Sequence, residues 1–358
     1  MTLTEQRSPS TEQPSTFTSN RLGSPRHVVV VAGAGLVGML SWLPTGSVNW
    51  ARWIVVALVT YCVAIYAITR VIEGRRQAVD RLMFAVVTSC FLIVALPLVS
   101  LVWTVVERGS NRFDRAFFTE TMRGVVGEGG GAYHAIVGTL IVTGIAALMS
   151  VPFGLLTAIY LAEYGHGNRL AKAIQSMVDV MTGIPSIVAG LFAYALFELL
   201  FGPGTRSGFA GAVALTVLMT PVVVRSVEEM LRLVPDELRE AAYALGVPKW
   251  KMIVKVVIPT AIAGIITGVV LAIARVIGET APLLVTAGLA QGVNWNPFDG
   301  RMTTLPVFTY YQYVQPGIPP SAGQDRAWTA ALTLVIIVML LFSVARILSA
   351  ALKPKGLK

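Results

Sequence analysis

Apolar runs long enough to cross a membrane recur along this chain. A helix needs around 20 predominantly apolar residues to cross a hydrocarbon core about 30 Å thick. Charged residues make up 13% of the sequence, whereas a typical soluble domain has about 25%. We therefore predict an all-α polytopic membrane protein with eight spans, near residues 28–43, 53–72, 83–106, 138–164, 176–201, 208–227, 260–288 and 327–349.

The distribution of basic residues predicts how these spans are oriented. If both termini are cytoplasmic, most of the 28 Lys and Arg residues fall on the inner side of the membrane, as the positive-inside rule requires. The formal net charge of +9 then reflects membrane orientation and contact with anionic lipid, and nucleic-acid binding is not indicated.

Several catalytic and cofactor motifs are absent from the sequence. No Gly is followed by Lys, so this chain cannot hold ATP through a P-loop. Gly33, Gly35 and Gly38 have the spacing of a dinucleotide-binding turn, but no acidic residue lies between Glu12 and Glu73 to bind the ribose. The few His and Cys residues are scattered, without a metal-ligand spacing. We expect no enzymatic activity, no metal site and no cofactor in this chain.

The longest polar interruption on the inner side runs from residue 225 to residue 259. Apolar residues at helical spacing, together with Pro235 and Asp236 as first-turn signals, predict a short amphipathic helix over about 235–245 that ends at Gly246. A second short helical segment follows Pro248. The apolar face fits either a groove on a partner protein or the surface of the bilayer, and the pattern alone does not choose between them.

The segment EAAYALGVPKWKMIVKVVIP, residues 240–259, resembles the EAA loop of ABC importer permeases. Glu240, Ala241, Ala242, Gly246 and Pro259 stand in the register of that motif. The resemblance implies that this loop couples the chain to a cytoplasmic ATP-binding subunit dimer. That partner would bind the ATP that this chain cannot hold.

Further segments resemble the phosphate importer permeases of the PstA type. The resemblance covers about residues 83–350 and implies a six-span permease of the bacterial inner membrane. It also implies a related permease as heterodimer partner and an extracytoplasmic binding protein that delivers inorganic phosphate. The segments are AIYLAEY (158–164), GIPSIVAGL (183–191), LRLVPDELREAAYALG (231–246) and ARVIGETAPLL (274–284).

The first two candidate spans lie outside the six-span pattern of that family. Their residues do not choose among regulation, lipid binding and recruitment of another subunit. The predicted organisation is a disordered cytoplasmic tail over 1–26, two extra N-terminal transmembrane helices over 27–80, a permease domain over 81–352 with its coupling loop at 235–259, and a basic C-terminal tail over 353–358.

Arg275 and Glu279 lie inside an otherwise apolar run. A charged side chain at the centre of a membrane helix costs about 2.5 to 3.5 kcal/mol, so both side chains should face protein or water. One interpretation is an ion pair that fixes helix packing. The other places Arg275 on the substrate path as a transient guanidinium contact for phosphate. Glu279 would then hold Arg275 when the path is empty, repel anions, or pair with a charge on the partner permease.

Other residues of the same regions complete the predicted path. Asp179 and Ser186 add polar groups around the break at Gly183 and Pro185, which fits either lining of the path or a simple packing kink. The GxxxG spacing of Gly264 and Gly268 favours close helix approach, which we predict at the permease dimer interface. Kinks or gates are expected at Gly183, Pro185, Gly278 and Pro282.

The sequence thus predicts the permease subunit of an ATP-driven phosphate importer working by alternating access. An importer of another oxyanion, such as sulfate or molybdate, fits the same residues. A proton-coupled secondary transporter using Arg275 and Glu279 is a second alternative, but it offers no reason for the polar loop at 235–259. A structural membrane scaffold is a third.

Overall fold

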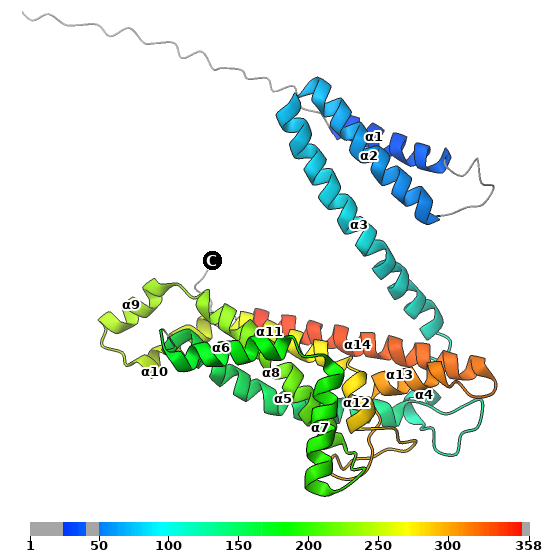
Figure 1. Ribbon diagram of the computed structural model, residues 1–358, viewed down its shortest axis with the longest axis vertical. Coiled ribbons are helices and arrows are strands. Elements are labelled where there is room, and N and C mark those ends of the chain that lie inside the picture. Colours follow the sequence, from blue (N-terminus) through cyan, green and yellow to red (C-terminus); the bar gives the residue numbers. More distant parts are fainter. Residues whose placement is uncertain (1–23, 41–49, 166, 353–358) are drawn as a thin grey trace, which may run out of the picture. The chain divides into compact units, whose positions relative to one another are not determined.

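The computed structural model describes residues 24–40, 50–165 and 167–352 (Figure 1). These residues form helices and loops, and no strand occurs among them, so the all-α prediction is confirmed. The predicted tails at 1–26 and 353–358 lie outside the described residues, except for 24–26. The chain divides into two compact units, residues 1–102 and 103–358.

The N-terminal unit consists of α1 (Ser24–Leu40), α2 (Trp50–Ile72) and the first part of α3 (Arg75–Gly109). α1 packs against α2, where the Trp53 indole donates a hydrogen bond to the carbonyl of Gly35 at 3.1 Å. Gly38 is needed for this contact, because a Cβ there would come within 2.9 Å of the Trp53 carbonyl oxygen. Of the three glycines of the apparent dinucleotide motif, Gly38 therefore serves helix packing, whereas a Cβ at Gly33 or Gly35 would meet nothing within 4 Å.

Six described helices are long and apolar enough to cross a membrane. The helices α6 (Arg169–Thr182) and α7 (Ser186–Phe201) make a seventh candidate if both belong to one span. The prediction of eight spans is therefore confirmed only in part. The first predicted span corresponds to α1, which has 17 residues and falls short of the roughly 20 required.

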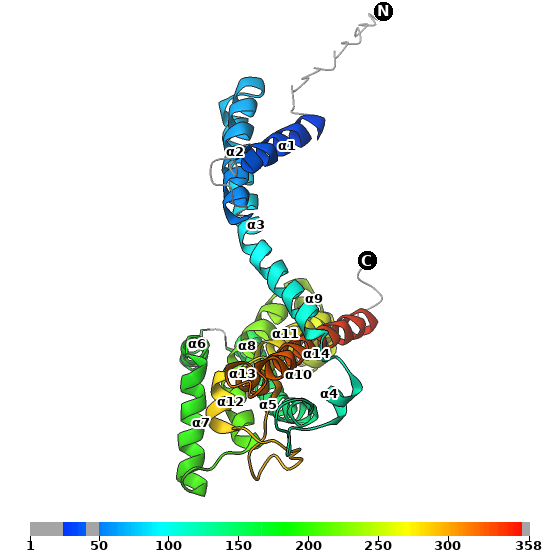
Figure 2. The same cartoon turned by 90° about the vertical axis from the view of Figure 1, so that its right-hand side faces the viewer.

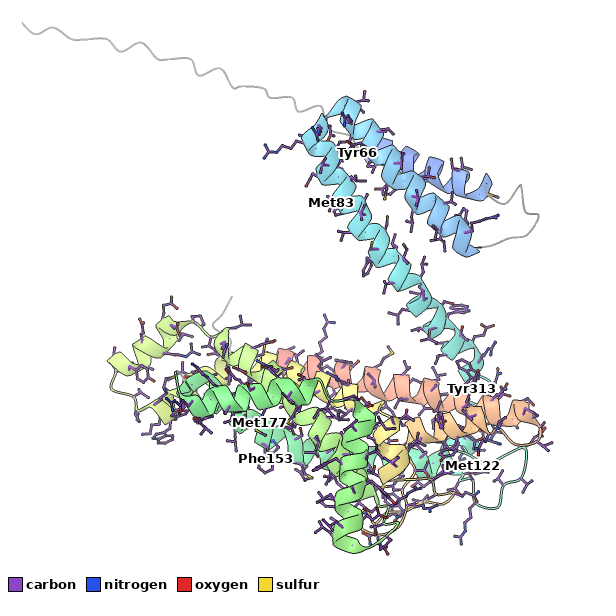
Figure 3. The ribbon with its side chains drawn as sticks, in the orientation of Figure 1. Tyr66, Met83, Met122, Phe153, Met177 and Tyr313 are labelled. Carbon is purple, nitrogen blue, oxygen red and sulfur yellow. The ribbon has the colours of Figure 1, made fainter. Side chains whose placement is uncertain are left out.

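Four long helices form the body of the second unit: α5 (Tyr133–Ile159), α8 (Gly208–Arg232), α11 (Ile258–Ile277) and α14 (Pro320–Leu352). They run side by side in both views (Figures 1 and 2). α8 is the most buried of the candidate spans and packs between α5 and α11. Large apolar side chains are exposed on this unit, as lipid contact requires; Phe153 on α5 and Met177 on α6 are examples (Figure 3).

The GxxxG glycines of α11 pack within this chain. A Cβ at Gly268 would come within 2.7 Å of the Ser226 Cβ on α8. Gly264 faces the side chain of Met230, which is also on α8. The prediction that these glycines lie at a permease dimer interface is therefore wrong. They allow α11 to approach α8 closely.

Two predicted spans are broken helices rather than continuous ones. α6 and α7 meet at an angle of 105°, because Pro185 disfavours helix at the residue before it and begins a new helix. The predicted span 260–288 likewise divides into α11, which ends at Ile277, and α12 (Ala281–Thr286). These two breaks position the candidate site.

Short helices complete the unit. They are α4 (Arg115–Thr119), α9 (Asp236–Ala244), α10 (Lys249–Met252) and α13 (Leu305–Val314), with π-helical segments η1 (Tyr160–Tyr164) after α5 and η2 (Ile253–Val257) before α11. α9 coincides closely with the amphipathic helix predicted over about 235–245.

Candidate functional site

The two helix breaks meet at a cavity of about 190 Å³. Three of the predicted path residues line it: Arg275 near the end of α11, Glu279 just beyond that end, and Ser186 at the start of α7. The remaining residues of the wall are mostly apolar and come from α6, the break after it, α8 and α11: Met181, Thr182, Ile184, Leu218, Val222 and Val276.

Close packing holds the two breaks together. A Cβ added at Gly190 on α7 would lie 2.5 Å from the Pro282 Cα on α12. Both residues are buried, and Leu283 next to Pro282 is buried as well. The absence of a side chain at Gly190 therefore lets α12 lie directly against α7, which brings Ser186 and Arg275 to the same cavity.

The predicted kink residues lie at the breaks. Gly183 follows the last residue of α6, and Pro185 immediately precedes α7. Gly278 follows the last residue of α11, and Pro282 is the second residue of α12.

Arg275 and Glu279 share the cavity without pairing. Their spacing would allow an ion pair on one continuous helix, but α11 ends at Ile277, so Glu279 is no longer one helical turn from Arg275. The ion pairs of the described chain do not include these two side chains. The Arg275 residue is exposed, and the N-terminal end of α7 adds partial positive charge beside it.

Asp179 lies outside this cavity. It pairs with Arg225 on α8, and the neighbouring Glu228 accepts hydrogen bonds from Gln175 at 3.1 Å and from Arg232 at 2.5 Å. Glu228 is buried, so this network fastens α6 to α8 by polar contacts. The sequence signals for this network are the helical spacings of Arg225, Glu228 and Arg232 on α8.

The predicted coupling residues lie on and around α9. Glu240 and Ala241 are exposed on this helix, whereas Ala242 is buried and packs in the main core. Gly246 has φ +72°, a conformation that favours glycine, and it ends the helix as predicted. Pro259 is exposed in the first turn of α11.

Exposed apolar side chains surround these residues. They belong to α9, α10 and the turns on either side of α9: Leu233, Leu238, Tyr243, Leu245 and Trp250. Such a set on one short loop indicates a contact surface.

A buried ion pair beside α9 had no local sequence signal. Glu163, in η1, has a side chain that is 4% exposed and lies 2.9 Å from the Arg239 guanidinium. The two residues are 76 positions apart, so no periodicity relates them. The segment AIYLAEY contains Glu163, but its resemblance assigned that residue no role.

Residues 150–356 match the family of binding-protein-dependent transport system inner membrane components. The chain is 51% identical over 251 residues to the phosphate transport system permease protein PstA 1 of Mycobacterium tuberculosis, an alignment that covers 69% of this chain and 81% of the relative. The chain belongs to the PstA-type phosphate transport permeases. It is 49% identical over 276 residues to PstA of Mycobacterium leprae, covering 76% of this chain and 88% of that relative.

Membership in the PstA type extends beyond mycobacterial sequences. The PstA of Yersinia pestis is 37% identical over 281 residues, covering 78% of this chain and 93% of the relative. Like these relatives, the chain is a membrane subunit of an ABC transporter for phosphate transport and not an enzyme. The region that matches the family model contains both the cavity and the loop at 235–259.

A solved structure shares the fold. The inward-facing MetNI methionine ABC transporter matches with a TM-score of 0.51 and 22% sequence identity, covering 62% of this chain and 96% of that chain.

Proposed function

We propose that this PstA-type permease forms the phosphate translocation path of an ATP-driven importer together with a second, related permease. Its coupling loop at 235–259 docks on a dimer of ATP-binding subunits, and an extracytoplasmic binding protein delivers inorganic phosphate. Both termini lie in the cytoplasm. The observation that supports this role best is the unpaired Arg275 at the meeting point of two broken helices.

The chemistry of the cavity fits transient binding of a small anion. Arg275 presents a planar, permanently charged guanidinium that matches phosphate oxygens. The first turn of α7 adds free N–H groups and the positive end of the helix, and Ser186 adds a hydroxyl. A volume of about 190 Å³ lies below the roughly 300–1,000 Å³ of sites for larger organic ligands.

Glu279 keeps the interaction weak. Its carboxylate lines the same cavity and repels a bound anion, which shortens the time that phosphate stays. Conduction requires a site that is favourable enough to enter and weak enough to leave. Since Arg275 and Glu279 are not paired, Arg275 is available to the anion without first breaking an ion pair.

The surface around α9 supports coupling to an ATPase. Glu240 and Ala241 are exposed there, together with the apolar side chains of the contact surface described above. Docking of an amphipathic helix in a groove on a partner protein is a recurring mode of recognition. Motion of that partner then reaches the permease through α9.

Uptake of radiolabelled phosphate tests this proposal. A strain that lacks the permease is complemented with wild type, Arg275→Gln or Arg346→Gln, and each variant is checked for co-purification with the ATP-binding subunit. Arg346 is an exposed arginine on α14 and serves as the matched control. We expect Arg275→Gln to lose uptake while keeping its partner, and Arg346→Gln to behave as wild type.

The outcomes separate the alternatives. Normal uptake by Arg275→Gln overturns its path role. Uptake of sulfate or molybdate, but not phosphate, by the wild-type strain indicates another oxyanion. Phosphate uptake that persists without the ATP-binding subunit and collapses with the proton gradient indicates a secondary transporter.

A further inference from the structure

Glu163 and Arg239 connect the end of a transmembrane helix to α9. The Nη2 and Nε atoms of Arg239 donate to the same Glu163 oxygen, Oε1, at 2.9 and 3.2 Å. The side chains are 4% and 15% exposed, so water does not screen the pair strongly. Glu163 belongs to η1, which continues α5, and Arg239 lies in the middle of α9.

The same guanidinium also binds the end of α8. Its Nη2 donates to the carbonyl of Leu231 at 2.9 Å, and its Nη1 donates to the carbonyl of Val234 at 2.6 Å. Carbonyls at a helix C-terminus lack partners within the helix, and Arg239 satisfies them from α9. One side chain therefore joins α9, η1 and the last turn of α8.

Lys249 adds a further connection from α10. Its ammonium group donates to the backbone carbonyl of Glu163 and lies 4.7 Å from the centre of the Tyr164 ring. Both short helices of the loop at 235–259 are thus tied to η1 by cations. The two cations hold different parts of Glu163, the carboxylate and the main chain.

A cavity of about 640 Å³ lies beside this junction. Ala171, Lys172 and Gln175 of α6 form one wall, and Asp236 and Tyr243 of α9 form another. Because this space separates α9 from α6, apolar packing does not hold the two helices together there. The polar bonds of Arg239 are a direct connection between α9 and the long helices.

Those long helices reach the Arg275 cavity. α5 packs along α8 over much of its length, and Leu218 and Val222 of α8 line the cavity. The junction also includes a π-helical segment, η1, and π-helical turns are frequent at functional sites. A continuous series of packed elements therefore runs from α9 to the candidate phosphate site.

We propose that the Glu163–Arg239 pair is the positioning link that makes α9 move together with α5 and α8. It transmits displacement of α9 by the ATP-binding subunits to the cavity around Arg275. This inference rests on the proposed function. Neither residue contacts phosphate or the partner; each acts by keeping α9 and the long helices in register.

The test measures the phosphate transported per ATP hydrolysed. The full complex of both permeases and the ATP-binding dimer is reconstituted in proteoliposomes with phosphate-loaded binding protein. The variants are Glu163→Gln and Arg239→Lys, which remove the charge or the forked geometry at little change in size. Their matched controls are Glu107→Gln and Arg346→Lys, at exposed positions on α3 and α14.

We expect both link variants to assemble and to keep ATP hydrolysis within about twofold of wild type, while phosphate transported per ATP falls at least tenfold. A pair that only stabilises the fold would lower assembly, hydrolysis and transport together. The double variant should be no worse than either single variant, because both changes break one link.

Specific results overturn the link. If Glu163→Gln or Arg239→Lys assembles and transports phosphate with the wild-type ratio, the link is wrong and the proposed function stands. If Glu163→Gln does not assemble, Arg239→Lys decides by the same ratio. If the wild-type complex hydrolyses ATP but moves no phosphate, the proposed function fails and the link fails with it.

Discussion

Gly190 on α7 lies directly against Pro282 on α12, at a distance that leaves no space for a Cβ. The contact joins two helix breaks that are about 90 residues apart in the sequence. Because glycine has no side chain, the two breaks can lie close enough to share one cavity.

Replacing Gly190 with Ala should separate α7 from α12. We expect phosphate uptake to fall at least tenfold, because the new Cβ would meet Pro282 at 2.5 Å. The control is Gly144→Ala on α5, where a Cβ meets nothing within 4 Å. Both changes stabilise the helix itself by about 0.5–1 kcal/mol, so a difference in uptake between the two variants reflects packing alone. Equal uptake by the two variants would argue against the contact.

Glu279→Gln should lengthen the stay of phosphate at Arg275. Removal of the carboxylate leaves the guanidinium unopposed in the cavity, so the anion binds more tightly and leaves more slowly. We expect the maximum rate of phosphate uptake to fall several-fold and the KM to fall with it. A lower rate at unchanged or higher KM would contradict this role.

Asp179→Asn should leave phosphate uptake within about twofold of wild type. Its pair with Arg225 is largely exposed to solvent, and such pairs contribute about 0–1 kcal/mol. Normal uptake would remove Asp179 from the predicted path, whereas complete loss would restore it there.

Glu228→Ala should lower the melting temperature of the detergent-solubilised protein. Glu228 is buried and accepts hydrogen bonds from Gln175 and Arg232. The arginines left behind are open to solvent, so the loss is that of hydrogen bonds to a charged group, which contribute about 1.5–3 kcal/mol. A melting temperature equal to that of wild type would show that this network does not hold α6 on α8.

Glu240→Ala should weaken association with the ATP-binding subunit while leaving the fold intact. Glu240 is exposed on α9 and has no ion-pair partner among the described residues, so its loss disturbs little within the chain. Co-purification of the subunit measures the effect, with Glu229→Ala at the exposed end of α8 as control. Full association of the Glu240 variant would place the coupling contact elsewhere.

The sequence predicted the long helices because their apolar runs exceed the membrane thickness, and it predicted α9 because Asp236 and Gly246 mark its ends. Proline and glycine positions indicated where spans would bend. They carried no information on the 105° angle or on the meeting of the two breaks, because both depend on packing between distant segments.

Some residues of the candidate site could be predicted from the sequence, and others could not. Arg275, Glu279 and Ser186 were recognised because polar residues are unusual in apolar runs, and the structure places them together. Asp179 was recognised for the same reason, but its partner Arg225 draws it to α8. The pair of Glu163 and Arg239 could not be predicted, since each residue alone looks like an ordinary charge near the end of a helix.

The close fit of Gly190 against Pro282 has a consequence for alternating access. If α7 rotates about residues 183–185, Pro282 must follow, and the bend at 278–280 changes by a related amount. The two bends then have a single angular degree of freedom. A label pair that reports either angle should therefore report both, and an intermediate with one bend open and the other closed should not be populated.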